Sequence, residues 1–250
     1  MSKLIVANWK MNGSLAEAKA RAAAIAERAS TSTNELVICP PHCHVAAVAE
    51  AVRGSEASVG GLDCHTEMKG AFTGDVSAAM LAELGCRYII VGHSERRYGH
   101  GETDAVVAAK AARVFEAKAI PIICVGETLA DREAGQAEAV VGRQLANSLP
   151  PVGEVIVVAY EPVWSISTSK NSAGRPPTAE EVVHIHSFIR AEVRRLLPEA
   201  NSIRVLYGGS AKPENADWLL ALPEVDGFLV GGASLDPDSF LATALVPPLL

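Results

Sequence analysis

Residues 155–164 read "VIVVAYEPVW". The first part of this stretch is almost continuously apolar, which is typical of a parallel strand covered on both faces of its sheet. A glutamate and a proline follow the apolar run directly, so a carboxylate stands at the carboxyl end of the expected strand. The stretch therefore predicts both a kind of sheet and an ionisable group at its edge.

Similar apolar runs recur along the whole chain. The other expected strands are residues 3–8, 35–39, 57–61, 87–92, 120–124, 203–208 and 227–232. Amphipathic patterns between the runs predict helices over 15–29, 44–53, 76–84, 104–118, 136–147, 213–221 and 237–245. A further helix is expected to begin at Thr178, which forms a capping-box pattern with Glu181.

Eight strand–helix units in 250 residues predict a single (β/α)8 barrel domain over residues 1–250. A doubly wound open sheet is the alternative architecture. The first expected strand is followed by "WKMNGS", which lacks the G-x-G-x-x-G fingerprint of that second fold. The barrel is therefore the preferred prediction.

The composition limits the kinds of partner. A net charge of −7 argues against general binding to nucleic acid or membrane surfaces, which calls for a basic face. No apolar run approaches the ~20 residues that span a bilayer, and the first residues carry no signal-peptide cleavage pattern. Five cysteines in a chain of this size indicate reduced thiols. We expect a cytoplasmic protein.

In a barrel of this kind, functional groups lie at the carboxyl ends of the strands. Asn8 and Lys10 follow the first expected strand, His93 and Glu95 follow the fourth, and Glu161 follows the sixth. Lys10 could be an ordinary surface lysine and His93 a structural histidine. Glu161 is either held in a salt bridge or kept as a general base, and desolvation would favour proton abstraction near neutral pH.

Glycine pairs follow the last two expected strands, at 208–209 and 231–232. They could be tight turns, but in a barrel the loops at these places commonly hold a phosphate with backbone N–H groups. Together with a base, an imidazole and a cation, they indicate proton transfer next to a carbonyl on a small phosphorylated substrate.

Cysteine and histidine residues gather after the second and third expected strands. They are Cys39, His42, Cys43, His44, Cys64 and His65. Their spacing matches no strong zinc pattern, so no metal site is predicted. Three other histidines, His100, His184 and His186, are expected at the surface.

Seven motifs then point to a known family. They are "ANWKMNG" (7–13), "GAFTGDVS" (70–77), "IIVGHSERR" (89–97), "CVGE" (124–127), "AYEPVW" (159–164), "YGGS" (207–210) and "LVGGASL" (229–235). In this order and spacing they resemble the triosephosphate isomerase family. The resemblance implies an isomerase of glycolysis and gluconeogenesis that interconverts dihydroxyacetone phosphate and D-glyceraldehyde 3-phosphate through an enediol(ate), without cofactor or metal.

The resemblance also implies roles for the catalytic residues. Glu161 would be the base and His93 a neutral electrophile, a pairing for which triosephosphate isomerase is itself the standard example. Lys10 would supply positive charge, Asn8 a supporting hydrogen bond, and Glu95 a carboxylate near Lys10.

Further residues are implied in substrate binding and support. Those matching the phosphate site of the family are Ser167, Gly209, Ser210, Gly231 and Gly232. Cys124 and Glu127 would be structural, with Glu127 bonding the indole N–H of Trp164, and Tyr207 would bond a closed lid.

The family is dimeric, and its dimer-contact loop corresponds to residues 62–77. Thr73 would sit beside Asn8 and Lys10 of the partner subunit, which implies a homodimer. Leu62 stands where the family usually has glutamine, so one interface amide is missing.

The largest departure from the family pattern is the expected lid, residues 161–177. Ser165, Ser167 and Ser169 stand where alanine and two glycines are usual, and "NSAGRPP" (171–177) makes the segment longer. If either glycine position needs left-handed geometry, a serine there costs roughly 1–2 kcal/mol.

Two alternatives to a fully active isomerase follow from this departure. One is a family member with weakened lid closure or altered specificity for a related phosphorylated ketose or aldose. The other is a non-enzymatic phosphometabolite-binding protein, which is disfavoured because binding alone does not require His93 and Glu161.

Overall fold

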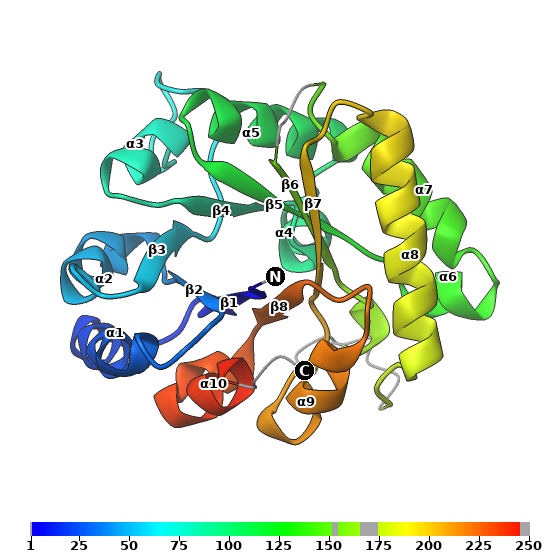
Figure 1. The fold of residues 1–250 in the computed structure, drawn as a ribbon. Coiled ribbons are helices and arrows are strands. Elements are labelled where there is room, and N and C mark those ends of the chain that lie inside the picture. Colours follow the sequence, from blue (N-terminus) through cyan, green and yellow to red (C-terminus); the bar gives the residue numbers. More distant parts are fainter. Residues whose placement is uncertain (1, 152–154, 166–174, 246–250) are drawn as a thin grey trace.

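The computed structural model describes residues 2–151, 155–165 and 175–245. Eight parallel strands close into a barrel in the order of the sequence, with β1 pairing to both β2 and β8. Helices surround this barrel on the outside (Figure 1). The closed parallel barrel confirms the predicted fold class.

The strands are short and follow the predicted positions closely. They are β1 (Leu4–Asn8), β2 (Glu35–Cys39), β3 (Ala57–Gly61), β4 (Tyr88–Val91), β5 (Ile120–Val125), β6 (Val155–Tyr160), β7 (Ser202–Tyr207) and β8 (Gly227–Val230).

The α-helices lie between the strands. They are α1 (Leu15–Ala29), α2 (Val45–Ala51), α3 (Ala78–Glu83), α4 (Ser94–His100), α5 (Asp104–Glu116), α6 (Leu129–Glu133), α7 (Ala137–Ser148), α8 (Ala179–Leu196), α9 (Pro213–Ala221) and α10 (Pro237–Ala244). Short 3-10 turns are η1 (His42–His44), η2 (Val163–Ser165) and η3 (Gly232–Leu235).

The strand residues divide into two groups because alternate side chains point to opposite faces. In β1, Leu4 and Val6 belong to a cluster made of strand side chains, which fills the barrel. Ile5 and Ala7 belong to a larger cluster that includes helix residues such as Ile25. The near-continuous apolar runs of the sequence thus serve two cores, one inside the barrel and one beneath the helices.

Two short helices, α4 and α6, were not predicted. Helix α4 occupies the polar stretch after His93, and α6 is a single short helix with no buried residue. Both therefore lack the apolar periodicity that predicts a helix. Helix α6 does carry a capping box between Thr128 and Asp131, which the sequence displays.

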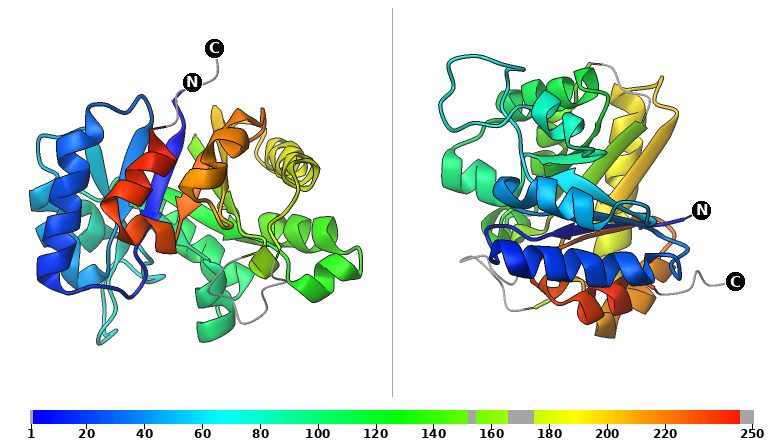
Figure 2. Two further views of the ribbon diagram at one scale, coloured as in Figure 1. Left: turned by 90° about the horizontal axis from the view of Figure 1, so that it is seen from below. Right: turned by 90° about the vertical axis from the view of Figure 1, so that its left-hand side faces the viewer.

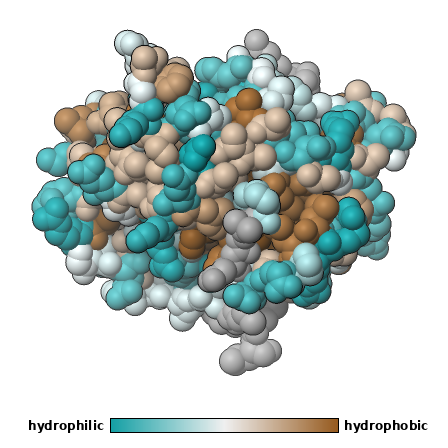
Figure 3. Space-filling model, turned by 90° about the horizontal axis from the view of Figure 1, so that it is seen from above, coloured by the Kyte–Doolittle hydropathy of each residue, from teal (hydrophilic) through white to brown (hydrophobic). Residues whose placement is uncertain are grey.

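The connection between β3 and α3, residues 62–77, projects from the body of the barrel in both views (cyan in Figure 2). Elsewhere the outer surface mixes hydrophilic and hydrophobic residues, as seen from one side in Figure 3. Among the described residues, no helix combines the length and apolar character that a membrane crossing demands.

Candidate active site

Glu161 is fixed by the backbone at the end of β6. Its N–H donates to the carbonyl of Val125 at 2.8 Å, and its side chain is almost fully buried. Gly126 makes this approach possible, because a Cβ built there would lie 1.8 Å from the carbonyl oxygen of Glu161. The strand therefore delivers a carboxylate into the barrel mouth on a rigid support.

Both carboxylate oxygens of Glu161 are occupied. Oε1 lies 2.8 Å from Nε2 of His93, and Oε2 accepts from the backbone N–H of Ser94 at 2.8 Å. Burial alone would raise the pKa of Glu161, but His93, the Ser94 amide and Lys10 together hold it below its ordinary value. In this conformation the desolvation expected at Glu161 is present, but these contacts outweigh it and keep the carboxylate ionised.

The hydrogen bonds of His93 identify its tautomer. His93 caps helix α4, and its Nδ1 accepts from the backbone N–H of Glu95 at 3.2 Å. A neutral imidazole has one donor and one acceptor nitrogen, so Nε2 carries the proton and donates to Glu161. A neutral hydrogen-bond donor therefore stands beside the candidate base.

Lys10 reaches the same place from the end of β1. Its φ of 51° lies in the left-handed region, which is uncommon for a residue other than glycine. The backbone N–H of Lys10 donates to Oδ1 of Asn8 at 3.0 Å, and its ammonium group bonds Oε1 of Glu95 at 2.7 Å. The predicted proximity of Asn8, Lys10 and Glu95 is thus present.

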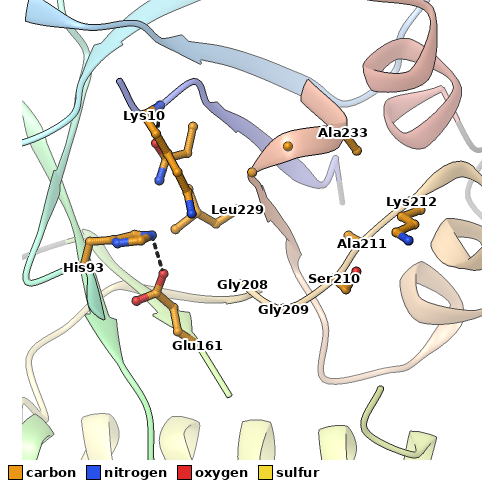
Figure 4. Close-up of a pocket in the computed structure, with 13 residues that line it drawn as sticks. Lys10, His93, Glu161, Gly208, Gly209, Ser210, Ala211, Lys212, Leu229 and Ala233 are labelled. Carbon is orange, nitrogen blue, oxygen red and sulfur yellow. Dashed lines mark hydrogen bonds and ion pairs between the residues drawn. The ribbon is translucent and has the colours of Figure 1, made fainter. Parts of the chain in front are cut away.

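These groups and the glycine loops line one cavity. Figure 4 shows Lys10, His93 and Glu161 directed into it, with the loop that holds Gly209 and Ser210 on another side. The lining residues are Asn8, Lys10, His93, Glu161, Gly208, Gly209, Ser210, Ala211, Lys212, Leu229, Gly231, Gly232 and Ala233. The cavity joins a carboxylate and an imidazole to two loops whose backbone N–H groups suit an anion.

Some residues of this site were missed, and several predicted lid residues lie outside the described part of the chain. Sequence reasoning did not identify Lys212 or the Ser94 amide, although Lys212 lies two positions after Ser210. Ser167 lies outside the described residues. The same is true of Ser169 and of positions 171–174 within the longer lid segment.

A buried carboxylate, Glu127, supports the segment after Glu161. Its Oε1 accepts from Trp164 Nε1 at 2.8 Å, which is the predicted bond, and from the hydroxyl of Tyr160 at 2.9 Å. Cys124 is also buried, and burial raises the pKa of its thiol well above the usual range. Cys124 is therefore an uncharged packing group.

Tyr207, the last residue of β7, contacts both the segment after Glu161 and the loop that holds Gly209. Its hydroxyl is 3.5 Å from that of Ser165. A Cβ on Gly209 would come within 2.3 Å of the same hydroxyl, so only glycine permits this packing.

A second cavity of about 490 Å³ adjoins the first on the other side of Lys10. It is lined by Asn8, Lys10, Met11, Pro41, His42, Cys43, Leu62, Asp63, His93, Glu95, Arg96 and His100. Thr73 lines neither cavity and is exposed.

Among the remaining histidines, one differs from its prediction. Within residues 2–151, 155–165 and 175–245, no three His, Cys, Asp or Glu side chains are grouped so that they could hold a metal ion. His100 and His184 are exposed as expected. His186 is fully buried, so its predicted surface position is wrong.

Comparison with known proteins gives one consistent result. The family model described as triosephosphate isomerase matches residues 3–245. The triosephosphate isomerase of Acidiphilium cryptum is 49% identical, over 98% of this chain and 98% of its own. That of Rhodopseudomonas palustris is 51% identical, over 96% of each chain. The crystal structure of triosephosphate isomerase from Bartonella henselae matches with a TM-score of 0.87 and 39% identity, covering 97% of this chain and 98% of that one.

Proposed function

The chain belongs to the triosephosphate isomerase family and interconverts dihydroxyacetone phosphate and D-glyceraldehyde 3-phosphate, and we propose that Glu161 moves the proton in this reaction. The observation that carries the proposal is the 2.8 Å contact between Glu161 and a donor nitrogen of His93 at the edge of the cavity.

The proposed chemistry uses each group in turn. Glu161 takes a proton from the carbon next to the substrate carbonyl, and the C–H electron pair forms the carbon–carbon double bond of the enediol(ate). Nε2–H of His93 donates to the oxygen on which negative charge develops, and the ammonium group of Lys10 adds positive charge nearby. A proton also passes from the substrate's hydroxyl oxygen to its former carbonyl oxygen by way of Nε2 of His93, and return of the proton from Glu161 to the former carbonyl carbon completes the isomerisation.

The groups around Glu161 hold it in a resting arrangement. Its carboxylate accepts hydrogen bonds from His93 and from the Ser94 amide, which lower its pKa and its basicity. When substrate binds, its C–H bond must take the place of these contacts at the carboxylate. Burial then raises the pKa of Glu161 with less opposition from hydrogen bonds, so the carboxylate becomes a stronger base. The same burial that these contacts offset at rest is thus used during the reaction.

The phosphate group of the substrate is proposed to lie against the two glycine-containing loops. Gly209, Ser210, Gly231 and Gly232 line the cavity, and Figure 4 shows Gly209 and Ser210 on the side away from His93. We also propose that Ser167 is a phosphate ligand and that residues 161–177 form the lid, because both match positions of the family pattern.

We also propose a cytoplasmic homodimer in which residues 62–77 are the contact loop. The loop projects from the barrel. In the proposed dimer it enters the second cavity, beside Lys10, of the partner subunit. Met11, at 95% exposure, and Phe72, at 42%, are large apolar side chains that a partner would cover. The five free cysteines agree with a reducing compartment.

The test of Glu161 is a pair of substitutions assayed in both directions of the reaction. Glu161→Gln should lower kcat by about 10²- to 10⁴-fold, because it removes the base and keeps the shape. Inorganic phosphate should still inhibit at a similar concentration, since the glycine loops are intact. Glu138→Gln, at an exposed glutamate on α7, is the matched control and should leave kcat unchanged.

Two results would contradict the proposal. A Glu161→Gln variant with the parent's kcat would remove Glu161 from the reaction. A parent protein that binds phosphate but shows turnover far below the diffusional ceiling of about 10⁸ M⁻¹s⁻¹ for kcat/KM would favour the altered-lid alternative.

A further inference from the structure

Arg175 reaches back to the segment that bears the candidate base. Its guanidinium carbon lies over the ring of Trp164, 4.8 Å from the ring centroid. Trp164 is fully buried and belongs to turn η2, which directly follows Glu161 and Pro162. A residue that precedes α8 therefore contacts a residue that follows β6.

Trp164 is covered by a second cation as well. The guanidinium carbon of Arg132, in α6, lies 5.2 Å from the same ring centroid. A guanidinium over an indole face is the strongest common form of cation–π contact in proteins. Trp164 is thus held through its ring by two arginines and through its N–H by Glu127.

Glu181 joins the two arginines to each other. Arg175 bonds it with both terminal nitrogens, at 2.9 and 3.0 Å, and Arg132 lies 2.9 Å from its Oε1. Glu181 also accepts from the backbone N–H of Thr178 in the capping box of α8. The Arg175 bonds are the largest cause that lowers the pKa of Glu181 to about 2, so this carboxylate is ionised throughout the working pH range.

The charges around Trp164 are balanced. Arg132 and Arg175 are cations, and Glu181 and Glu127 are their carboxylate partners, with Arg132 lying 3.3 Å from Glu127. A planar guanidinium can stack on a ring and bond a carboxylate at its edge at the same time, which a lysine cannot do as well. The arrangement therefore uses a property specific to arginine at position 175.

We propose that Arg175 is a positioning residue that ties Trp164, and with it the segment carrying Glu161, to the first turn of α8. The contact acts through Trp164 because Arg175 is not among the residues that line the catalytic cavity. The backbone N–H of Val163 donates to the backbone carbonyl of Glu127 at 3.1 Å, and that of Glu161 donates to the carbonyl of Val125, so η2 and Glu161 are held against the same segment at the end of β5. This inference rests on the proposed role of Glu161 as the base.

The sequence context makes Arg175 a feature of this chain. It lies in "NSAGRPP", the stretch by which the chain departs from the usual family pattern, and two prolines follow it. Because proline fixes φ, residues 176 and 177 limit the directions that Arg175 can take relative to α8. Arg175 thus adds a cation over Trp164 to the one that Arg132 supplies.

The experiment compares Arg175→Ala and Arg175→Lys with the parent enzyme. The alanine variant should lower kcat by about three- to tenfold, because small misplacements of a catalytic group are costly, while KM stays within about twofold. The lysine variant keeps the positive charge but loses the planar guanidinium group. Its kcat should therefore lie between that of the parent and that of the alanine variant. Arg195→Ala is the matched control, since Arg195 pairs with Glu192 on the exposed far part of α8.

Acrylamide quenching of tryptophan emission supplies a readout that is independent of activity. Removing Arg175 should increase quenching in the folded protein, because the Trp164 ring loses its cover. The increase should be absent when the same change is made in a Trp164→Phe background, which assigns it to Trp164 rather than to Trp9 or Trp218.

Failure of the inference can be told from failure of the proposed base. If Arg175→Ala leaves both quenching and kcat at the parent's values, or matches Arg195→Ala, Arg175 has no positioning role. If quenching rises while kcat is unchanged, Trp164 is covered by Arg175 but Glu161 is not positioned by it, which also overturns the inference. Neither result depends on the outcome of Glu161→Gln.

Discussion

His186 is a buried titratable side chain in the middle of α8. Its ring meets that of Tyr160 edge-on, with centroids 5.8 Å apart. Nδ1 lies 3.1 Å from the carbonyl oxygen of Glu224, and Nε2 has no hydrogen-bond partner among the described residues. Burial lowers the pKa of His186 to about 4, so the folded protein keeps this ring neutral.

This histidine should make stability depend on pH. In the unfolded chain its pKa is about 6.5, so between pH 6.5 and 4 the unfolded state binds a proton that the folded state does not. The free energy of unfolding should therefore fall as the pH falls through this window, by up to about 3 kcal/mol from this group.

Urea unfolding of a His186→Phe variant at fixed protein concentration tests this. Its free energy of unfolding should show a shallower decline between pH 6.5 and 4 than the parent's. His184→Phe, at an exposed histidine, should keep the parent's slope. An unchanged slope in His186→Phe would show that His186 titrates alike in both states.

At the residue scale, the sequence predicted which groups meet but not the state of each group. Glu161, His93 and Lys10 were predictable because strand ends converge on one face of a barrel. The resting contacts of Glu161 were not, since they depend on the Ser94 amide and therefore on the unpredicted helix α4. His186 was missed because histidine is not counted as apolar, although Val182, Ile185, His186 and Ile189 recur with helical spacing on the buried face.

At the scale of elements, a buried charge network ties α4 and α5 to the end of β3. Lys110 in α5 is 4% exposed and bonds both oxygens of Asp63 at 2.8 Å and Glu102 at 2.6 Å. Arg96 in α4 lies 3.1 Å from Asp63 and 2.6 Å from Glu102. Two cations thus pair with two carboxylates beside the second cavity, and Oε2 of Glu102 has no hydrogen-bond partner among the described residues.

Removing one member of this network should be costly. Lys110→Met leaves Asp63 and Glu102 with only Arg96, and breaking a buried pair by removing one partner typically destabilises by about 3–5 kcal/mol. The free energy of unfolding of Lys110→Met measures this loss, with Lys19→Met at an exposed position as the control. A loss below that of the control would mean that water replaces the ammonium group without penalty.

The elements themselves were predicted well where the apolar pattern was strong. Helices α1 and α9 begin and end at the predicted residues, because caps and apolar spacing agree there. Helices α4 and α6 are held by capping and by polar contacts, which leave a weaker trace in the sequence. The charge network was not predictable, because Asp63, Arg96, Glu102 and Lys110 are brought together only by the tertiary fold.

At the scale of the whole molecule, the barrel shape followed from the alternation of eight apolar runs with helical stretches. What the sequence did not predict was the pair of adjoining cavities on either side of Lys10, since each is bounded by loops from several strands. The second cavity and the projecting loop 62–77 lead to the prediction for assembly.

We expect sedimentation to give a species of twice the 26.2 kDa chain mass. Thr73→Arg, at an exposed turn of the projecting loop, should produce monomers and lower kcat by roughly 10²-fold, since a loop from the partner no longer supports Lys10. Asp217→Arg on the outside of α9 introduces the same side chain at an exposed site and should remain dimeric. A fully active monomer of the Thr73→Arg variant would contradict a site that depends on assembly.

The pairing of β1 with both β2 and β8 has a consequence for how the chain is made. Strand β2 leaves the ribosome soon after β1, but the other edge of β1 has no partner until Gly227–Val230 has been synthesised. At typical rates of about 5–20 residues per second, that edge waits roughly 10–45 s. During this interval the unpaired edge of an apolar strand can pair with other nascent chains. The incomplete barrel therefore needs chaperones until β8 has been made.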